Sequence, residues 1–161
     1  MKQTNKQMTR HAEATAWMVK SARFCLPAKF NLAFRYLYGF GSEQKFKEGF
    51  LELRDTADAG NIPSYLPLAT LFATGTGTNR SVANARYWIA KLESEGDFYA
   101  AMLNTYDDDT LTEKLVLQMM KDAPHIEYLP KGNELFANFL KNINFKPQLD
   151  KENQEEVCVK K

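Results

Sequence analysis

The sequence predicts an all-α fold, a solenoid of antiparallel helix pairs, and three observations carry that prediction. Residues 32–60 and 68–96 match at an offset of 36 residues, glycines keep the same register in both segments, and apolar residues recur at helical spacing. A repeat of roughly this length is typical of arrays whose neighbouring units share one continuous core. The corresponding positions are Leu32, Ala33, Tyr36, Gly39, Gly41, Gly49, Leu53 and Gly60, matched by Leu68, Ala69, Phe72, Gly75, Gly77, Ala85, Ile89 and Gly96.

The first helix of the first unit follows Pro27, which is tolerated in an opening turn. Leu32, Ala33 and Tyr36 share one face of this helix at i, i+1, i+4 spacing. Gly39 is expected to end it, because glycine readily adopts the left-handed conformation of a helix C-terminus.

The second helix of the first unit buries apolar and small residues at helical spacing. Gly41 permits a tight turn before it, and Ser42 is expected to cap its N-terminus. A small residue at Gly49 lets the paired helices approach closely, and Gly60 ends the unit. The residues predicted on the buried face are Phe46, Gly49, Phe50 and Leu53.

The second unit repeats this plan. Pro67 is tolerable only in a first turn, so its first helix is expected to begin near Ser64. The two repeats are predicted over about 28–61 and 62–97. Asp97 is then placed to cap the helix that follows.

Degenerate half-units extend the array on both sides. Residues 14–22 repeat the spacing of 85–93, which predicts that Trp17, like Trp88, lies in the core. Residues 99–105 and 111–120 are predicted to form a third helix pair, with Asp107–Asp109 in place of the glycine turn. A capping helix is predicted over 132–143, within a repeat domain of 1–145. The charged residues 146–161 are predicted to be disordered.

The repeat pattern resembles the Sel-one-like repeat family, relatives of the tetratricopeptide repeat. That family combines an apolar–Ala pair, an aromatic residue and Gly-x-Gly with a helix that carries small-x-x-Trp and closes on small residues and glycine. The resemblance covers about 28–100 and departs at Glu52, which stands where the tryptophan is expected, and at Leu92–Glu93, which replaces a pair of alanines. It implies a right-handed α-α superhelix that binds another protein on its concave surface. The matching residues are Leu68, Ala69, Phe72, Gly75, Gly77, Ala85, Trp88 and Gly96.

The composition limits the classes of protein to which the chain can belong. The 161 residues suggest one domain, and 44% hydrophobic with 25% charged residues is ordinary for a globular chain. Cys25 and Cys158 lie far apart, so we expect free thiols, with Cys25 buried as a small hydrophobe. Neither a signal sequence nor the about 20 consecutive apolar residues of a membrane span is recognisable, so we expect a cytoplasmic protein of bacterial type.

Motifs for catalysis or for cofactor and metal binding are not found. His11 and His125 lack ligand-like neighbours at i+3 or i+4, and the run at Asp107–Asp109 lacks the alternation and glycine of a calcium loop. The aspartates are better explained as a helix N-terminus. The Gly75–Thr78 turn is not followed by the Lys-Ser or Lys-Thr of a phosphate loop. We therefore expect neither an enzyme nor a cofactor.

The candidate binding surface is a second stripe on the first helices of the two repeats. Aromatic residues beside an arginine are typical of protein-binding hot spots. The alternative is that Phe34 and Tyr38 pack against the N-terminal helix around Trp17. The candidate protein-binding residues are Asn31, Phe34, Arg35, Tyr38, Thr70 and Thr74.

The predicted function is protein binding without catalysis. The chain is expected to act as an adaptor, a regulator or an inhibitor of the immunity-protein type. The alternative is a nucleic-acid-associated protein that uses residues 1–35, which carry seven basic residues and one acid. The overall net charge of +1 disfavours that alternative. Residues 97–134 are acidic, so the charge differs between the two ends of the array.

Overall fold

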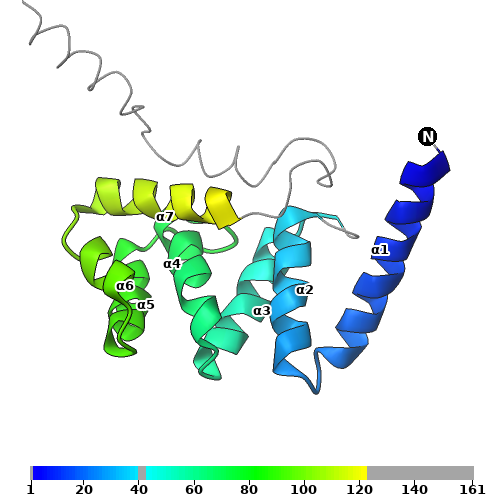
Figure 1. Cartoon of the computed structure of the whole chain (residues 1–161), viewed down its shortest axis with the longest axis horizontal. Helices are drawn as coiled ribbons and strands as arrows, with labels where there is room; N and C mark the ends of the chain where they lie inside the picture. Colours follow the sequence, from blue (N-terminus) through cyan, green and yellow to red (C-terminus); the bar gives the residue numbers. More distant parts are fainter. Residues whose placement is uncertain (1, 40–42, 123–161) are drawn as a thin grey trace, which may run out of the picture.

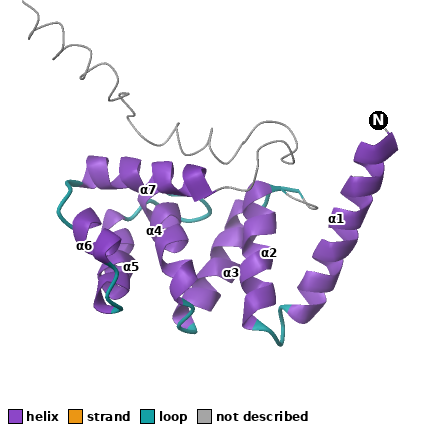
Figure 2. Cartoon of the chain, in the orientation of Figure 1, coloured by secondary structure: helices purple, strands orange, loops and turns teal. Residues whose placement is uncertain are grey.

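The computed structural model describes residues 2–39 and 43–122, and these form helices without any strand (Figures 1 and 2). From α1 to α6, consecutive α helices run antiparallel and stack side by side, which confirms the predicted all-α solenoid. The elements are α1 (Lys2–Ser21), α2 (Leu26–Tyr38), α3 (Phe46–Asp58), the 3-10 helix η1 (Ile62–Ser64), α4 (Tyr65–Thr74), α5 (Val82–Ser94), α6 (Phe98–Leu103) and α7 (Asp108–Asp122).

The packing follows the repeat. The most extensive contacts join α2 with α3 and α4 with α5, while α1 packs on α2 and α6 on α5. Helix α7 crosses the array and packs against α4 (Figure 1). This crossing helix turns the open side of the α2–α4 layer into a partly enclosed space.

Equivalent positions of the two repeats fill the core. Ala33 and Ala69 of the first helices are fully buried, as are Leu53 and Ile89 of the second helices. At Gly49 an added Cβ would lie 2.8 Å from two side-chain carbons of Leu37, so a larger residue would displace Leu37 between the paired helices. Trp88 is buried as predicted.

Most of the residues predicted to begin or end a helix lie at helix ends in the structure. Gly39 adopts φ of +69° and its N–H donates to the carbonyl of Arg35, ending α2. Helix α3 begins at Phe46 after Lys45, so the expectation that Ser42 caps it is wrong; Ser42 itself lies outside the described residues. Asp97 accepts a hydrogen bond from the N–H of Ala100 (2.9 Å), as expected of a cap on α6.

Two buried-residue predictions are wrong. Trp17 is 68% exposed, because α1 packs on α2 with one face and no described helix covers the other. Cys25 is exposed, because it lies in the turn between α1 and α2. The predicted capping helix over 132–143 and the tail 146–161 lie outside the described residues. Among the helices that are described, none has the length and apolar character needed to cross a membrane.

Candidate protein-binding groove

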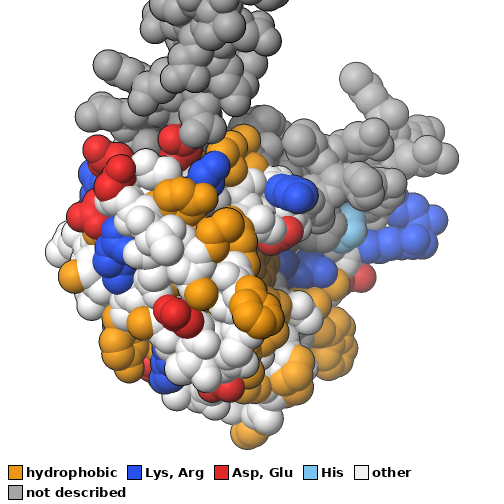
Figure 3. Space-filling model, turned by 60° about the vertical axis from the view of Figure 1, so that its left-hand side comes forward, with side chains coloured by type: hydrophobic (Ala, Val, Ile, Leu, Met, Phe, Trp, Pro, Cys, Tyr) orange, Lys and Arg blue, Asp and Glu red, His pale blue; other side chains and the backbone are white. Residues whose placement is uncertain are grey.

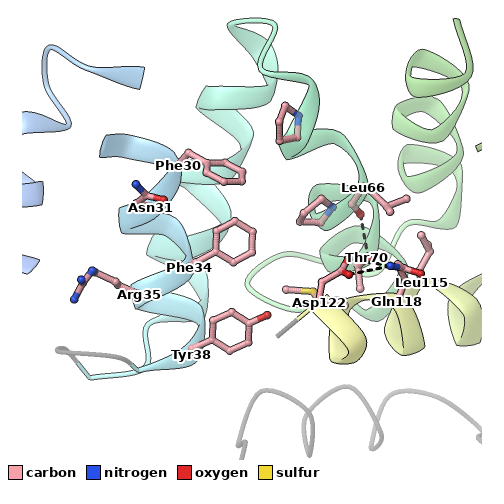
Figure 4. Close-up of a pocket in the computed structure, with 13 residues that line it drawn as sticks. Phe30, Asn31, Phe34, Arg35, Tyr38, Leu66, Thr70, Leu115, Gln118 and Asp122 are labelled. Atoms are coloured by element: carbon pink, nitrogen blue, oxygen red, sulfur yellow. Dashed lines mark hydrogen bonds between the residues drawn. The ribbon is translucent and has the colours of Figure 1, made fainter. Parts of the chain in front are cut away.

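A cavity of about 390 Å³ opens between α2, the η1–α4 segment and the C-terminal half of α7 (Figure 4). We call it the groove. Its lining is mainly apolar, and it lies on the open side of the α2–α4 layer, partly closed by α7. Open apolar cavities with a few polar groups are the usual form of binding sites in proteins.

One wall of the groove is an aromatic ladder on α2. Phe30, Phe34 and Tyr38 follow at i, i+4 and i+8, and helical spacing therefore places them on one face. The rings of Phe30 and Phe34 meet edge to face with centroids 4.9 Å apart, and those of Phe34 and Tyr38 stack at 6.0 Å. This mutual packing limits the freedom of the rings before any partner arrives.

The opposite wall comes from two elements. Leu66, Pro67 and Thr70 line it from α4, and Leu115 and Met119 line it from α7. The Thr70 hydroxyl donates to the carbonyl of Leu66 (3.0 Å), so its proton is already used within α4. The wall is consequently apolar along most of its length.

Charged and polar groups mark the two sides of the groove. The guanidinium of Arg35 turns away toward α1 and donates from Nη1 to the carbonyl of His11 (3.2 Å) and to Oγ1 of Thr15 (3.1 Å) (Figure 4). Burial lowers the pKa of Arg35 from its usual value. Across the groove, both carboxylate oxygens of Asp122 accept from Nε2 of Gln118 at 3.0 Å.

The hydroxyl of Tyr38 stays protonated in the groove. Burial, with a smaller contribution from the charge of Asp122, raises the pKa of Tyr38 to about 12. Tyr38 therefore offers a neutral hydroxyl and an aromatic surface rather than a charge over the physiological range.

The structure brings five of the six sequence-predicted residues to the groove. Asn31, Phe34, Arg35, Tyr38 and Thr70 all line it. Phe34 and Tyr38 point toward α4 and α7 rather than toward Trp17, so the alternative of packing around that tryptophan is wrong (Figure 4).

Thr74 does not reach the groove. It is buried, its hydroxyl donates to the carbonyl of Thr70 (2.8 Å), and it pairs with the hydroxyl of Thr76 (2.8 Å). These hydrogen bonds hold the last turn of α4. The Thr74 hydroxyl is therefore engaged within the protein and does not face the groove.

Sequence reasoning missed the contribution of α7. Leu115, Met119 and Asp122 recur at i, i+4 and i+7, a spacing that predicts one helical face. That signal was available, but nothing in the sequence tells that this face crosses over α4 rather than continuing the stack. Phe30, at i−4 from Phe34, was likewise recognisable as part of the ladder.

Metal binding has no support in the described part of the chain. Residues 2–39 and 43–122 contain no group of three or more His, Cys, Asp or Glu side chains that is able to hold a metal ion. The run at Asp107–Asp109 serves the start of α7 instead, where Oδ1 of Asp107 accepts from the N–H of Thr110 (2.8 Å).

Stacked helix pairs with an open apolar groove define a helical repeat solenoid. The solved structure of a Sel1 repeat protein from Oxalobacter formigenes has the same fold, with a TM-score of 0.54 and 18% sequence identity. The match covers 81% of this chain and 62% of the Oxalobacter chain. The resemblance predicted from the repeat pattern is thus confirmed at the level of the fold. No family model matches the chain, and neither does any curated protein.

Proposed function

We propose that this protein is a non-enzymatic interaction module that holds an apolar segment of a partner protein in the groove. The observation that carries the proposal is the aromatic ladder of Phe30, Phe34 and Tyr38 facing an apolar wall across an open cavity of about 390 Å³. This volume lies at the lower end of the about 300–1,000 Å³ typical of ligand pockets, so the cavity accommodates a few bulky side chains rather than a folded surface.

Physical chemistry favours an apolar occupant. Burying one large apolar side chain contributes about 1.5–3 kcal/mol, and aromatic walls are enriched at the centres of protein interfaces. The titratable side chains that line the groove, Arg35, Tyr38 and Asp122, do not form a nucleophile–base pair. Holding a partner without transforming it is therefore the function that we propose, in the manner of an adaptor, a regulator or an inhibitor, within the cytoplasm of a bacterium.

The test is partner capture with matched variants. The tagged full chain is used to recover bound proteins from the host, which mass spectrometry identifies, and affinity for the purified partner is then measured for Phe34→Ala. We expect a loss of at least about 30-fold, which corresponds to the about 2 kcal/mol or more that truncating a hot-spot residue costs. Tyr87→Ala is the control, since Tyr87 is an exposed aromatic residue on α5 that does not line the groove.

Circular dichroism and thermal melting verify that both variants keep the fold. A partner that binds Phe34→Ala as tightly as the natural chain would exclude the groove as its binding site. A partner that is equally weakened by Tyr87→Ala would point to a different surface.

The nucleic-acid alternative is tested in the same capture. Lys29 forms an ion pair with Asp55 (3.2 Å), and Arg35 donates to groups on α1, so part of the basic charge in residues 1–35 is used within the protein. Binding to phosphates weakens steeply with salt, whereas apolar binding does not. Loss of every partner on nuclease treatment or at moderate salt would favour the alternative.

A further inference from the structure

Three equivalent positions of the array carry an exposed large hydrophobic residue. Leu26, Ile62 and Phe98 are the first residues of α2, η1 and α6, and they are spaced by 36 residues, the length of the repeat. Their side chains are 37%, 41% and 92% exposed. Single exposed apolar residues need no explanation, but a row that recurs in every unit does.

The row follows one edge of the solenoid. The chain enters α2, α4 and α6 along the same side of the array, the lower edge in Figure 1. Figure 3 turns the α5–α6 end forward and shows hydrophobic side chains along the lower rim. Phe24, in the turn before α2, extends the row and is 91% exposed. We call these four residues the edge row.

Opposite charges flank the two ends of the edge row. Arg23 lies three residues before Leu26, and Glu95 lies three residues before Phe98. Both charged side chains are exposed. Arg23 and Glu95 are 72 residues apart, two repeat lengths, so they occupy equivalent places at opposite ends of the array.

This arrangement is complementary to itself. A two-fold axis that lies in the plane of the edge and passes beside Ile62 reverses the row, so that Leu26 meets the partner's Phe98 and Ile62 meets its own copy. The same operation brings Arg23 to the partner's Glu95. Phe24 then lies over the partner's Gly96, where an added Cβ would find no atom within 4 Å.

We propose that the edge row binds a second copy of this chain in an antiparallel two-fold dimer. Two-fold dimers with the same patch on both subunits are the commonest assemblies of soluble proteins. The other two-fold arrangement, with its axis along the row, places Arg23 against Arg23 and Glu95 against Glu95 and is disfavoured by like-charge repulsion. The edge row has four residues, far fewer than the about 20–30 residues that each partner contributes to a standard interface, so we expect a weak dimer.

The experiment measures self-association of the full chain by sedimentation equilibrium over a range of concentrations. We expect a reversible monomer–dimer equilibrium that Ile62→Asp shifts to monomer, because two carboxylates would meet at the axis. Tyr87→Asp, an exposed aromatic position on α5 outside the row, should leave the equilibrium unchanged.

Charge reversal tests the antiparallel geometry. Arg23→Glu and Glu95→Arg should each weaken dimerisation about tenfold, and the double variant should recover it, since each subunit then presents the exchanged pair. A chain that stays monomeric at every concentration overturns the proposal. So does a dimer that persists in Ile62→Asp, or a double variant that fails to recover. Circular dichroism confirms folding of each variant.

Discussion

At the scale of single residues, the structure explains why the second repeat carries glycine at position 77, the second glycine of its Gly-x-Gly pair. Its φ is +71°, and an added Cβ would lie 2.7 Å from the carbonyl carbon of Phe46 and 2.9 Å from Cβ of Phe50. Gly77 belongs to the second repeat, whereas Phe46 and Phe50 belong to α3 of the first. The glycine therefore permits neighbouring units to pack closely as well as permitting the turn.

We expect Gly77→Ala to lower the free energy of unfolding by about 3 kcal/mol, since it combines a positive φ with a collision against backbone. Gly60→Ala is the matched control: Gly60 also has a positive φ, of +90°, but an added Cβ would meet nothing within 4 Å. That variant should lose only about 1 kcal/mol. Urea denaturation measures both, and equal losses would contradict the steric explanation.

At the scale of elements, α7 decides the shape of the groove. The helix is anchored by Arg86 of α5, which donates from Nη2 to the carbonyl of Tyr106 (2.7 Å) and to Oδ1 of Asp108 (2.9 Å). Asp107 caps its first turn. Both interactions hold the helix N-terminus, and the wall residues Leu115 and Met119 follow from there. Any loosening of the start of α7 should consequently widen the groove.

The Asp107 cap makes the start of α7 sensitive to acid. Hydrogen bonds from the backbone N–H and then the side chain of Thr110 hold the pKa of Asp107 below its usual value near 3.8. The cap therefore stabilises α7 above that value, and its contribution is lost as the pH falls through the lowered pKa. We expect the protection of the Thr110 amide against hydrogen exchange to fall on acidification.

Asp107→Asn separates this cap from other carboxylates, because asparagine caps helices about as well and does not titrate. The variant should keep Thr110 protected at the acidic pH at which the natural chain loses protection. Exchange rates are compared with those expected for an unstructured chain at each pH. An identical loss in both proteins would assign the acid sensitivity to other groups.

At the scale of the whole molecule, the repeat explains what the sequence was able to predict. The 36-residue repeat reflects patterns within short stretches of the sequence. It therefore predicted the helix pairs, the end of α2 at Gly39 and the groove residues on α2. Contacts between distant elements leave no such pattern. The crossing of α7, the exposure of Trp17 and the burial of Thr74 depend on which helix covers which face, and the periodicity of one helix does not contain that information.

The linear architecture also predicts uneven stability along the chain. In a solenoid each unit is stabilised by its neighbours, so terminal elements open before central ones. Helix α1 packs mainly on α2, whereas α4 contacts α3, α5 and α7. Amide exchange followed by mass spectrometry should therefore find α1 much less protected than α4. Equal protection of the two helices would mean that the described array unfolds as a single cooperative unit.

A substitution of Arg35 tests how strongly α1 is coupled to the rest of the array, because Arg35 joins α1 to α2 through the His11 carbonyl and the Thr15 hydroxyl. Hydrogen bonds from a charged donor contribute about 1.5–3 kcal/mol, so Arg35→Met should reduce the protection of α1 by at least about tenfold and leave α4 unchanged. Lys29→Met is the control on the same helix: its ion pair with Asp55 is partly exposed and joins α2 to α3, so α1 should not respond. If Arg35→Met lowered the protection of α4 as much as that of α1, the two helices would belong to one cooperative unit. Binding of a partner in the groove beside Arg35 would then stabilise the whole array rather than its N-terminal end.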